Sequence, residues 1–108
     1  MEKELIIYET ETGKVPFEQW LSKLKDHRAK AKIQVRLDRL IKGHYGDCKL
    51  LRGGIGEIRI DYGNGYRIYF GEQQHRLVIV LLLGGTKKTQ DKDIDLAIQY
   101  WENYKRQY

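Results

Sequence analysis

The sequence contains very little cysteine and proline. Among its 108 residues there is one cysteine, Cys48, and one proline, Pro16. A single cysteine cannot form an intramolecular disulfide, and without a second cysteine nearby it gives no support to a thiolate metal site. We therefore expect a protein of the reducing cytoplasm without metal chemistry.

Long apolar runs are also missing. No stretch approaches the roughly 18 to 20 residues that a transmembrane helix requires. The first residues, MEKELIIYETETGK, lack the basic region and cleavage site of a signal peptide. Hydrophobic residues make up 41% of the chain, which is typical of a globular protein. The length suits one domain, predicted over residues 1–108.

Positive charge is in excess. Lys and Arg number 20 against 15 Asp and Glu, giving a formal net charge of +5. The excess is concentrated in the middle of the chain, between residues 23 and 88. A basic surface on a small domain favours a nucleic acid or an acidic protein as partner.

The pattern of apolar residues predicts an α+β fold. Pro16 suits the first turn of a helix, and Asp26 can cap a second helix that ends before Gly43. A final amphipathic helix begins with Thr89 or Asp91 as its cap. Strands are expected at residues 4–8, 57–62, 66–70 and 77–83. The predicted order is β-α-α-β-β-β-α.

Residues 77–83, LVIVLLL, have no polar alternation. A strand of this kind is covered on both faces and lies inside the sheet rather than at its edge.

The segment GEIRIDYGNGYRIYF predicts a β-hairpin with a polar face. A two-residue turn at Asn64 and Gly65 would mix isoleucines and arginines on both faces. A three-residue loop, with Gly65 in the left-handed conformation, separates them. The predicted cross-strand pairs are Ile58 with Phe70, Ile60 with Ile68, Arg59 with Tyr69, and Asp61 with Arg67.

The polar face of this hairpin has two interpretations. It can be the solvated side of a sheet, with Asp61 and Arg67 forming a surface ion pair. Alternatively, Arg59 and Arg67 present planar guanidinium groups to phosphate oxygens while Tyr69 stacks on a base. The loop GGTKKTQ would then bring further cations, Lys87 and Lys88, to the same face.

Several motifs together resemble a known family. LLRGGIGEIRIDYGNGYRIYF, followed by LLLGGTKKTQDKDIDLAIQYW, is similar to the addiction-module killer proteins. These form the phage-derived Gp49-like branch of the RelE/HigB toxin superfamily. The resemblance covers nearly the whole chain, including GDCKLL at residues 46–51.

The resemblance implies a RelE-like fold, a small twisted antiparallel-rich sheet with the first two helices on one face. It also implies a toxin encoded beside an antitoxin, commonly a helix-turn-helix protein. RelE-like toxins cut mRNA in the ribosomal A site without metal or cofactor. By position, Arg67 matches the arginine that holds the scissile phosphate, Arg59 a neighbouring basic position, and Lys87 the basic residue after the last strand. Lys49 lies in the G-D-x-K element and is expected to contact RNA, as are Arg52, Tyr69 and Lys88.

The sequence also departs from its relatives. The usual GGDKS is GGTKK here, and Ile94 falls near the position of a tyrosine in RelE itself. Only Glu57, Tyr69 and His44 remain as candidates for the general base. Two alternatives to the ribosome-dependent nuclease stay open: a ParE-like inhibitor of DNA gyrase, and a basic RNA-binding module without catalysis.

Overall fold

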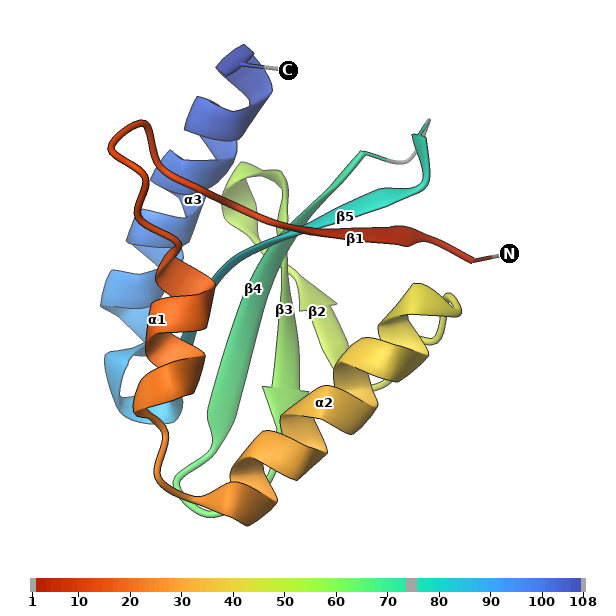
Figure 1. The fold of residues 1–108 in the computed structure, drawn as a ribbon, viewed down its shortest axis with the longest axis vertical. Coiled ribbons are helices and arrows are strands. Elements are labelled where there is room, and N and C mark those ends of the chain that lie inside the picture. The colour runs from red at the N-terminus through yellow and green to blue at the C-terminus, as the bar shows by residue number, and fades with distance from the viewer. Residues whose placement is uncertain (1, 74–75, 108) are drawn as a thin grey trace.

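The computed structural model describes residues 2–73 and 76–107 and confirms a mixed α+β fold. Five strands and three α-helices are joined by short loops and 3-10 turns (Figure 1). In chain order the elements are β1 (Glu4–Ile7), α1 (Pro16–Lys23), α2 (His27–Ile41), β2 (Cys48–Leu50), η1 (Arg52–Gly54), β3 (Ile55–Ile60), β4 (Tyr66–Gln73), β5 (Val78–Thr86), η3 (Lys87–Thr89) and α3 (Gln90–Gln107).

The strands form one sheet in the order β1-β5-β4-β3-β2. Strand β1 runs parallel to β5, and every other neighbouring pair is antiparallel. The prediction for the apolar run is confirmed, because β5 has a neighbour on each side and is buried from Val78 through Gly85. Strand β5 continues through Gly84 and Gly85 to Thr86, so the loop expected at GGTKKTQ is wrong.

Helices cover both faces of the sheet. Helices α1 and α2 pack on one face, as predicted, and α3 packs on the other (Figure 1). The core under α1 and α2 contains Phe17, Ile33, Leu37, Leu40, Ile58, Ile60, Ile68, Phe70, Ile79 and Leu81. The core under α3 contains Tyr8, Ile55, Tyr69, Val78, Val80, Leu82, Leu83, Ala97, Trp101 and Tyr104.

One tryptophan lies flat against a glycine on each face. A Cβ atom added to Gly84 would lie 2.0 Å from Trp20 of α1, and one added to Gly71 would lie 2.2 Å from Trp101 of α3. Only glycine allows an indole to approach a strand so closely. These two glycines therefore set the distance between each helix and the sheet.

The N-terminal cap predicted from the sequence is correct for α2 but not for α3. The Asp26 carboxylate accepts hydrogen bonds from the backbone N–H groups of Arg28 and Ala29, which confirms the predicted cap. The caps expected at Thr89 or Asp91 are wrong. The helical turn begins earlier, directly after β5, and the Thr86 N–H donates to the Thr89 hydroxyl at 3.3 Å. With no loop between strand and helix, Thr89 lies inside the first turn.

Strand β2 was not predicted, so the observed order is β-α-α-β-β-β-β-α. It has only three residues, Cys48–Leu50, and pairs with β3 at the edge of the sheet. The glycines on either side, Gly46 and Gly53, resemble a loop in the sequence. Pairing with β3 creates this strand, and local propensity does not indicate it.

The predicted hairpin register is wrong by two residues. The observed pairs are Ile58 with Ile68, Arg59 with Arg67, and Ile60 with Tyr66, so the loop has five residues, 61–65. A slip of two leaves every side chain on its predicted face, because the period of a strand is two. The alternation of apolar and polar residues could therefore not distinguish the two registers. Gly65 does adopt the left-handed conformation, with φ of 81°.

No helix within the described residues is long and apolar enough to cross a membrane. Among the same residues, no group of three or more His, Cys, Asp or Glu side chains is arranged to hold a metal ion.

Candidate functional site

Arg59 and Arg67 lie directly opposite each other on β3 and β4, on the face covered by α3. Two like charges in this position repel unless something compensates them. The Glu57 carboxylate does so for Arg59, accepting a hydrogen bond from its Nε at 3.0 Å. The predicted ion pair of Arg67 with Asp61 is wrong, because Asp61 lies beyond the end of β3.

Arg67 has few polar contacts for a buried arginine. It is 9% exposed, and its Nη1 donates to the backbone oxygen of Tyr66 at 3.1 Å. Its Nε has no hydrogen-bond partner among the described residues. A buried donor without a partner is unusual and costs free energy, so Arg67 has hydrogen-bonding capacity left for a ligand.

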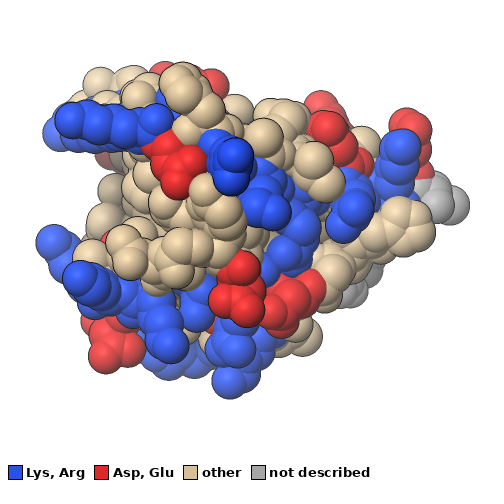
Figure 2. Space-filling view, turned by 90° about the horizontal axis from the view of Figure 1, so that it is seen from below, with Lys and Arg blue, Asp and Glu red and all other residues tan. Residues whose placement is uncertain are grey.

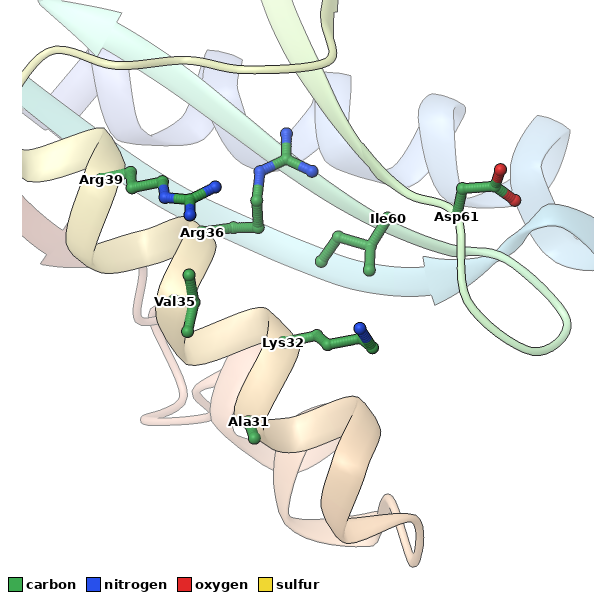
Figure 3. A pocket seen from close by; sticks show the side chains of 7 residues that line it. All are labelled: Ala31, Lys32, Val35, Arg36, Arg39, Ile60 and Asp61. Carbon is green, nitrogen blue, oxygen red and sulfur yellow. The ribbon is translucent and has the colours of Figure 1, made fainter.

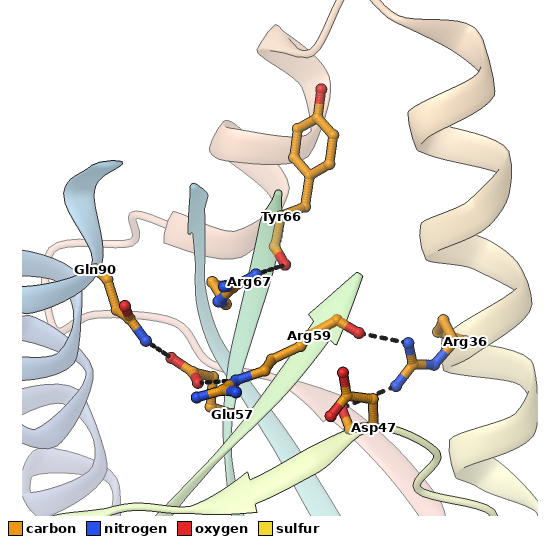
Figure 4. Close-up of polar contacts among 7 residues, drawn as sticks. All are labelled: Arg36, Asp47, Glu57, Arg59, Tyr66, Arg67 and Gln90. Carbon is orange, nitrogen blue, oxygen red and sulfur yellow. Dashed lines mark hydrogen bonds and ion pairs between the residues drawn. The ribbon is translucent and has the colours of Figure 1, made fainter. Parts of the chain in front are cut away.

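Glu57 is fully buried and joins the sheet to α3. Its two carboxylate oxygens accept hydrogen bonds from Arg59 and from Gln90, whose Nε2 lies 2.7 Å away. Figure 4 shows Glu57 and Arg59 between Gln90 on α3 and Arg36 on α2. Gln90 was not among the predicted site residues, although it is the last residue of the segment GGTKKTQ.

Lys87 joins the same site through the hairpin loop. Its backbone N–H donates to the Gly65 oxygen at 3.0 Å. A Cβ atom on Gly65 would lie 3.5 Å from Arg67 Nη1 and 3.5 Å from Lys87 Cβ, so these two cations flank the glycine. The structure therefore brings together Arg59, Arg67 and Lys87. Figure 2 looks onto this end of the molecule and shows Lys and Arg gathered across a hollowed face, with Asp and Glu among them.

The expectation that Tyr69 stacks on a base conflicts with its position. Tyr69 is fully buried in the core under α3, and its hydroxyl has no hydrogen-bond partner among the described residues. Burial, together with the nearby Glu57 and Asp93 carboxylates, raises the pKa of Tyr69. Its ring has no free face to offer a base. Tyr62 and Tyr66, which stack at the end of the hairpin and are partly exposed, are better placed.

The other predicted contacts are spread around this cluster. Lys49 on β2 is exposed and lies opposite Glu57 in the register. Lys88 is exposed beside Lys87 in η3. Arg52 forms a surface ion pair with Asp95 of α3 and precedes β3, so it lies toward the other end of that strand from Arg59.

A groove runs between α2 and the end of β3, with a volume of about 400 Å³ (Figure 3). It is lined by Ala31, Lys32, Val35, Arg36, Arg39, Ile60 and Asp61. The Arg36 guanidinium donates to three backbone oxygens, those of Arg59 at 2.6 Å, Asp47 at 3.1 Å and Tyr45 at 3.2 Å. It therefore fixes the strand end that carries Arg59.

The candidates for the general base lie in different parts of the structure. Glu57 lies at the centre of the cation cluster but is fully buried and holds two donors. His44 is exposed and follows α2, where its backbone N–H bonds to Arg39. Among the described residues, no hydrogen bond or ion pair joins the His44 side chain to Arg59, Arg67 or Lys87.

Comparison with known families agrees with the motifs. The profile of the family described as "Phage derived protein Gp49-like (DUF891)" matches residues 19–102. The chain belongs to the Gp49-like family. An uncharacterized protein of Haemophilus influenzae is 54% identical over 81 residues, which cover 75% of this chain and 81% of the relative. Membership of the Gp49-like family suggests a toxin of a toxin–antitoxin system, and hence an antitoxin partner. The matched region of this Gp49-like protein includes the whole cation cluster.

Proposed function

We propose that this protein is the toxin of a type II toxin–antitoxin system and cleaves mRNA on the ribosome as a metal-independent endoribonuclease. In this proposal residues 1–108 form one RelE-like domain that acts in the cytoplasm. A cognate antitoxin, a helix-turn-helix protein, restrains it. The family membership supports a toxin, and the cation cluster supports chemistry at a phosphate.

The main support for the proposal is the burial of Arg67 together with its unused hydrogen-bond donor. Its guanidinium is buried beside Arg59 and Lys87, and its Nε lacks a partner among the described residues. A planar guanidinium donates two parallel hydrogen bonds to phosphate oxygens. A phosphate bound here would satisfy Arg67 and offset the repulsion between the two opposed arginines.

The proposed reaction is transesterification within the RNA. The 2′-hydroxyl attacks the adjacent phosphorus, and the bond to the 5′-oxygen of the next nucleotide breaks, leaving a cyclic phosphate. Negative charge develops on the non-bridging oxygens in the transition state. Arg67 stabilises this charge, while Arg59, held by Glu57, and Lys87, held through Gly65, orient the backbone.

The flanking cations would bind the rest of the mRNA. Lys49 and Lys88 are exposed next to the cluster and are free to contact phosphates on either side of the cleaved bond. Arg52 would first have to leave its ion pair with Asp95. We assign no base contact to Tyr69, because it is buried.

The deciding experiment is induction of the protein in cells, followed by mapping of new mRNA 5′ ends. Breaks positioned by codons are the expected result. Intact transcripts with loss of DNA supercoiling activity in vitro would reject this function in favour of a ParE-like gyrase inhibitor. Intact transcripts with RNA binding alone would favour a module without catalysis.

Arg67→Ala should relieve growth arrest and lower the rate of mRNA cleavage by about 100-fold or more, because it removes a preorganised donor to the transition state. Arg106→Ala is the control, since Arg106 is exposed in the last turn of α3. Circular dichroism checks that both variants fold. Full toxicity of a folded Arg67→Ala protein would remove this residue from the mechanism.

A further inference from the structure

The Asp93 carboxylate lies directly over the backbone of β5. A Cβ atom added to Gly85 would lie 2.0 Å from Asp93 Oδ2 and 3.1 Å from the Thr89 hydroxyl. Any larger residue at position 85 would displace the carboxylate. Gly85, the second glycine of GGTKK, therefore makes room for an acidic side chain of α3.

This position brings Asp93 over the strand next to that of Arg67. Gly85 is the cross-strand partner of Arg67, and neighbouring strands lie about 4.8 Å apart. The carboxylate above Gly85 therefore lies over the strand that neighbours Arg67, on the face covered by α3. The Tyr69 hydroxyl is close enough to both Asp93 and Glu57 for their charges to act on it.

The two carboxylates near Arg67 differ in what they can reach. Glu57 is fully buried, and both of its oxygens accept hydrogen bonds from side chains. Asp93 is partly exposed, accepts one hydrogen bond from the Thr89 hydroxyl at 2.5 Å, and forms no ion pair among the described residues. Only Asp93 combines access to a ligand with a free oxygen.

We infer that Asp93 is the proton acceptor of the proposed cleavage reaction. The inference rests on the proposed function and supplies the group that sequence reasoning did not find. The 2′-hydroxyl proton moves to Asp93 as the bond from the 2′-oxygen to phosphorus forms. The bond from phosphorus to the 5′-oxygen breaks, and Asp93 returns the proton to that oxygen. No water, metal or further reactant is consumed, and the carboxylate is regenerated.

The surroundings of Asp93 suit a base. Burial raises the pKa of Asp93, while the hydrogen bond from Thr89 and the charge of Lys92 act in the opposite direction. The other charged or titratable groups at this end of the face are Arg67 and Tyr69 from β4, and Glu57 and Arg59 from β3. A carboxylate whose pKa is raised above its ordinary value is a stronger base than an exposed aspartate.

The test is single-turnover cleavage of a defined mRNA on purified ribosomes, measured from about pH 5 to pH 8. The wild-type rate should fall at acidic pH as Asp93 becomes protonated. Asp93→Asn should lower the rate at neutral pH by about 100-fold or more and remove this acidic inflection. Asp91→Asn is the matched control, because it makes the same change at an exposed position in the first turn of α3.

The outcomes separate the inference from the function on which it rests. If the wild-type protein cleaves mRNA and Asp93→Asn keeps the rate or the inflection, Asp93 is not the acceptor and the function stands. If the wild-type protein cleaves nothing, the function fails and the inference fails with it. The inflection is read from residual cleavage, so reduced folding of the variant would not hide the result.

Discussion

The two faces of the sheet are built differently. Under α1 and α2 every buried core residue is hydrophobic, and the Lys3–Glu72 ion pair at the margin of this face is partly exposed. Under α3 the core is apolar along most of its length, around Val80, Leu82 and Trp101, but contains buried charge where β3 ends and β4 begins. There Glu57 and Arg67 are buried, and Glu57 accepts a hydrogen bond from Gln90 of α3.

This difference indicates which face is adapted to a ligand. Burying charged groups costs free energy unless every group is paired, and Arg67 keeps an unpaired donor among the described residues. The apolar face needs no such arrangement to fold. We therefore assign the chemistry to the polar end of the α3 face and stability to the rest.

The largest effect on stability should come from the glycines beneath the tryptophans. Gly84→Ala and Gly71→Ala each force a methyl group against an indole, at Trp20 and Trp101 respectively. Overpacking of this kind lowers the free energy of unfolding by about 1 to 3 kcal/mol. Urea denaturation should show similar losses on the two faces.

The double variant Gly71→Ala with Trp101→Phe provides the control, because the smaller ring leaves room for the methyl group. It should be more stable than the sum of the two single changes predicts. Strict additivity would show that the close approach does not limit packing.

A pair of adjacent residues on β3 tests the comparison directly. Ile58 and Glu57 are both fully buried but face opposite sides. Ile58→Val should cost about 0.5 to 1.5 kcal/mol of stability and leave cleavage unchanged. Glu57→Gln should change stability less, because it removes a buried charge while Arg59 stays partly exposed to water, yet should slow cleavage by releasing Arg59.

Denaturation curves and cleavage rates of these two variants give the answer. The opposite outcome is that Glu57→Gln loses much stability while its folded fraction cleaves mRNA at the wild-type rate. That result would show that Glu57 and Arg59 serve the stability of the fold, and it would contradict their proposed role in cleavage.

The smallest effect concerns two aspartates near helix starts on opposite faces. Hydrogen bonds from the backbone of α2, chiefly from Ala29, lower the pKa of Asp26, whereas burial raises that of Asp93. Asp26 therefore stabilises the fold above its unfolded pKa, and this contribution is lost as the pH falls through its folded pKa. Asp93 has the opposite effect on stability. Burial disfavours its ionised form in the folded state, so ionisation of Asp93 lowers the free energy of unfolding.

Melting temperatures across pH should reveal this contrast. Asp26→Asn should be less stable than wild type at neutral pH, and the difference should shrink as the pH falls through the folded pKa of Asp26. Asp93→Asn should be as stable as wild type or more so at neutral pH. A clear destabilisation of Asp93→Asn would contradict the assigned pKa direction.

Much of this architecture could be predicted from local patterns. Pro16 and Asp26 mark helix starts, the run LVIVLLL marks a strand inside the sheet, and alternation assigns each hairpin side chain to its face. The motifs also indicated the Gp49-like family, which the family profile confirms. These features depend on residues close together in the chain.

The site was only partly predictable. Arg59, Arg67 and Lys87 were selected, and the structure brings them together, although in another register. Gln90 and Asp93 were missed, because residues at the start of a helix usually face solvent and nothing local indicates contact with a strand.

By itself the sequence determined the periodicities, and with them the element types, the two faces of each strand and the family. Only the tertiary structure decided how deeply the polar residues are buried and which side chains they contact. Burial of Glu57 and Tyr69, pairing of Arg59 with Arg67, and the approach of Asp93 to Gly85 all arise where α3 crosses β3, β4 and β5. Such contacts join residues far apart in the chain, and their energies depend on exclusion of water, which no local pattern records.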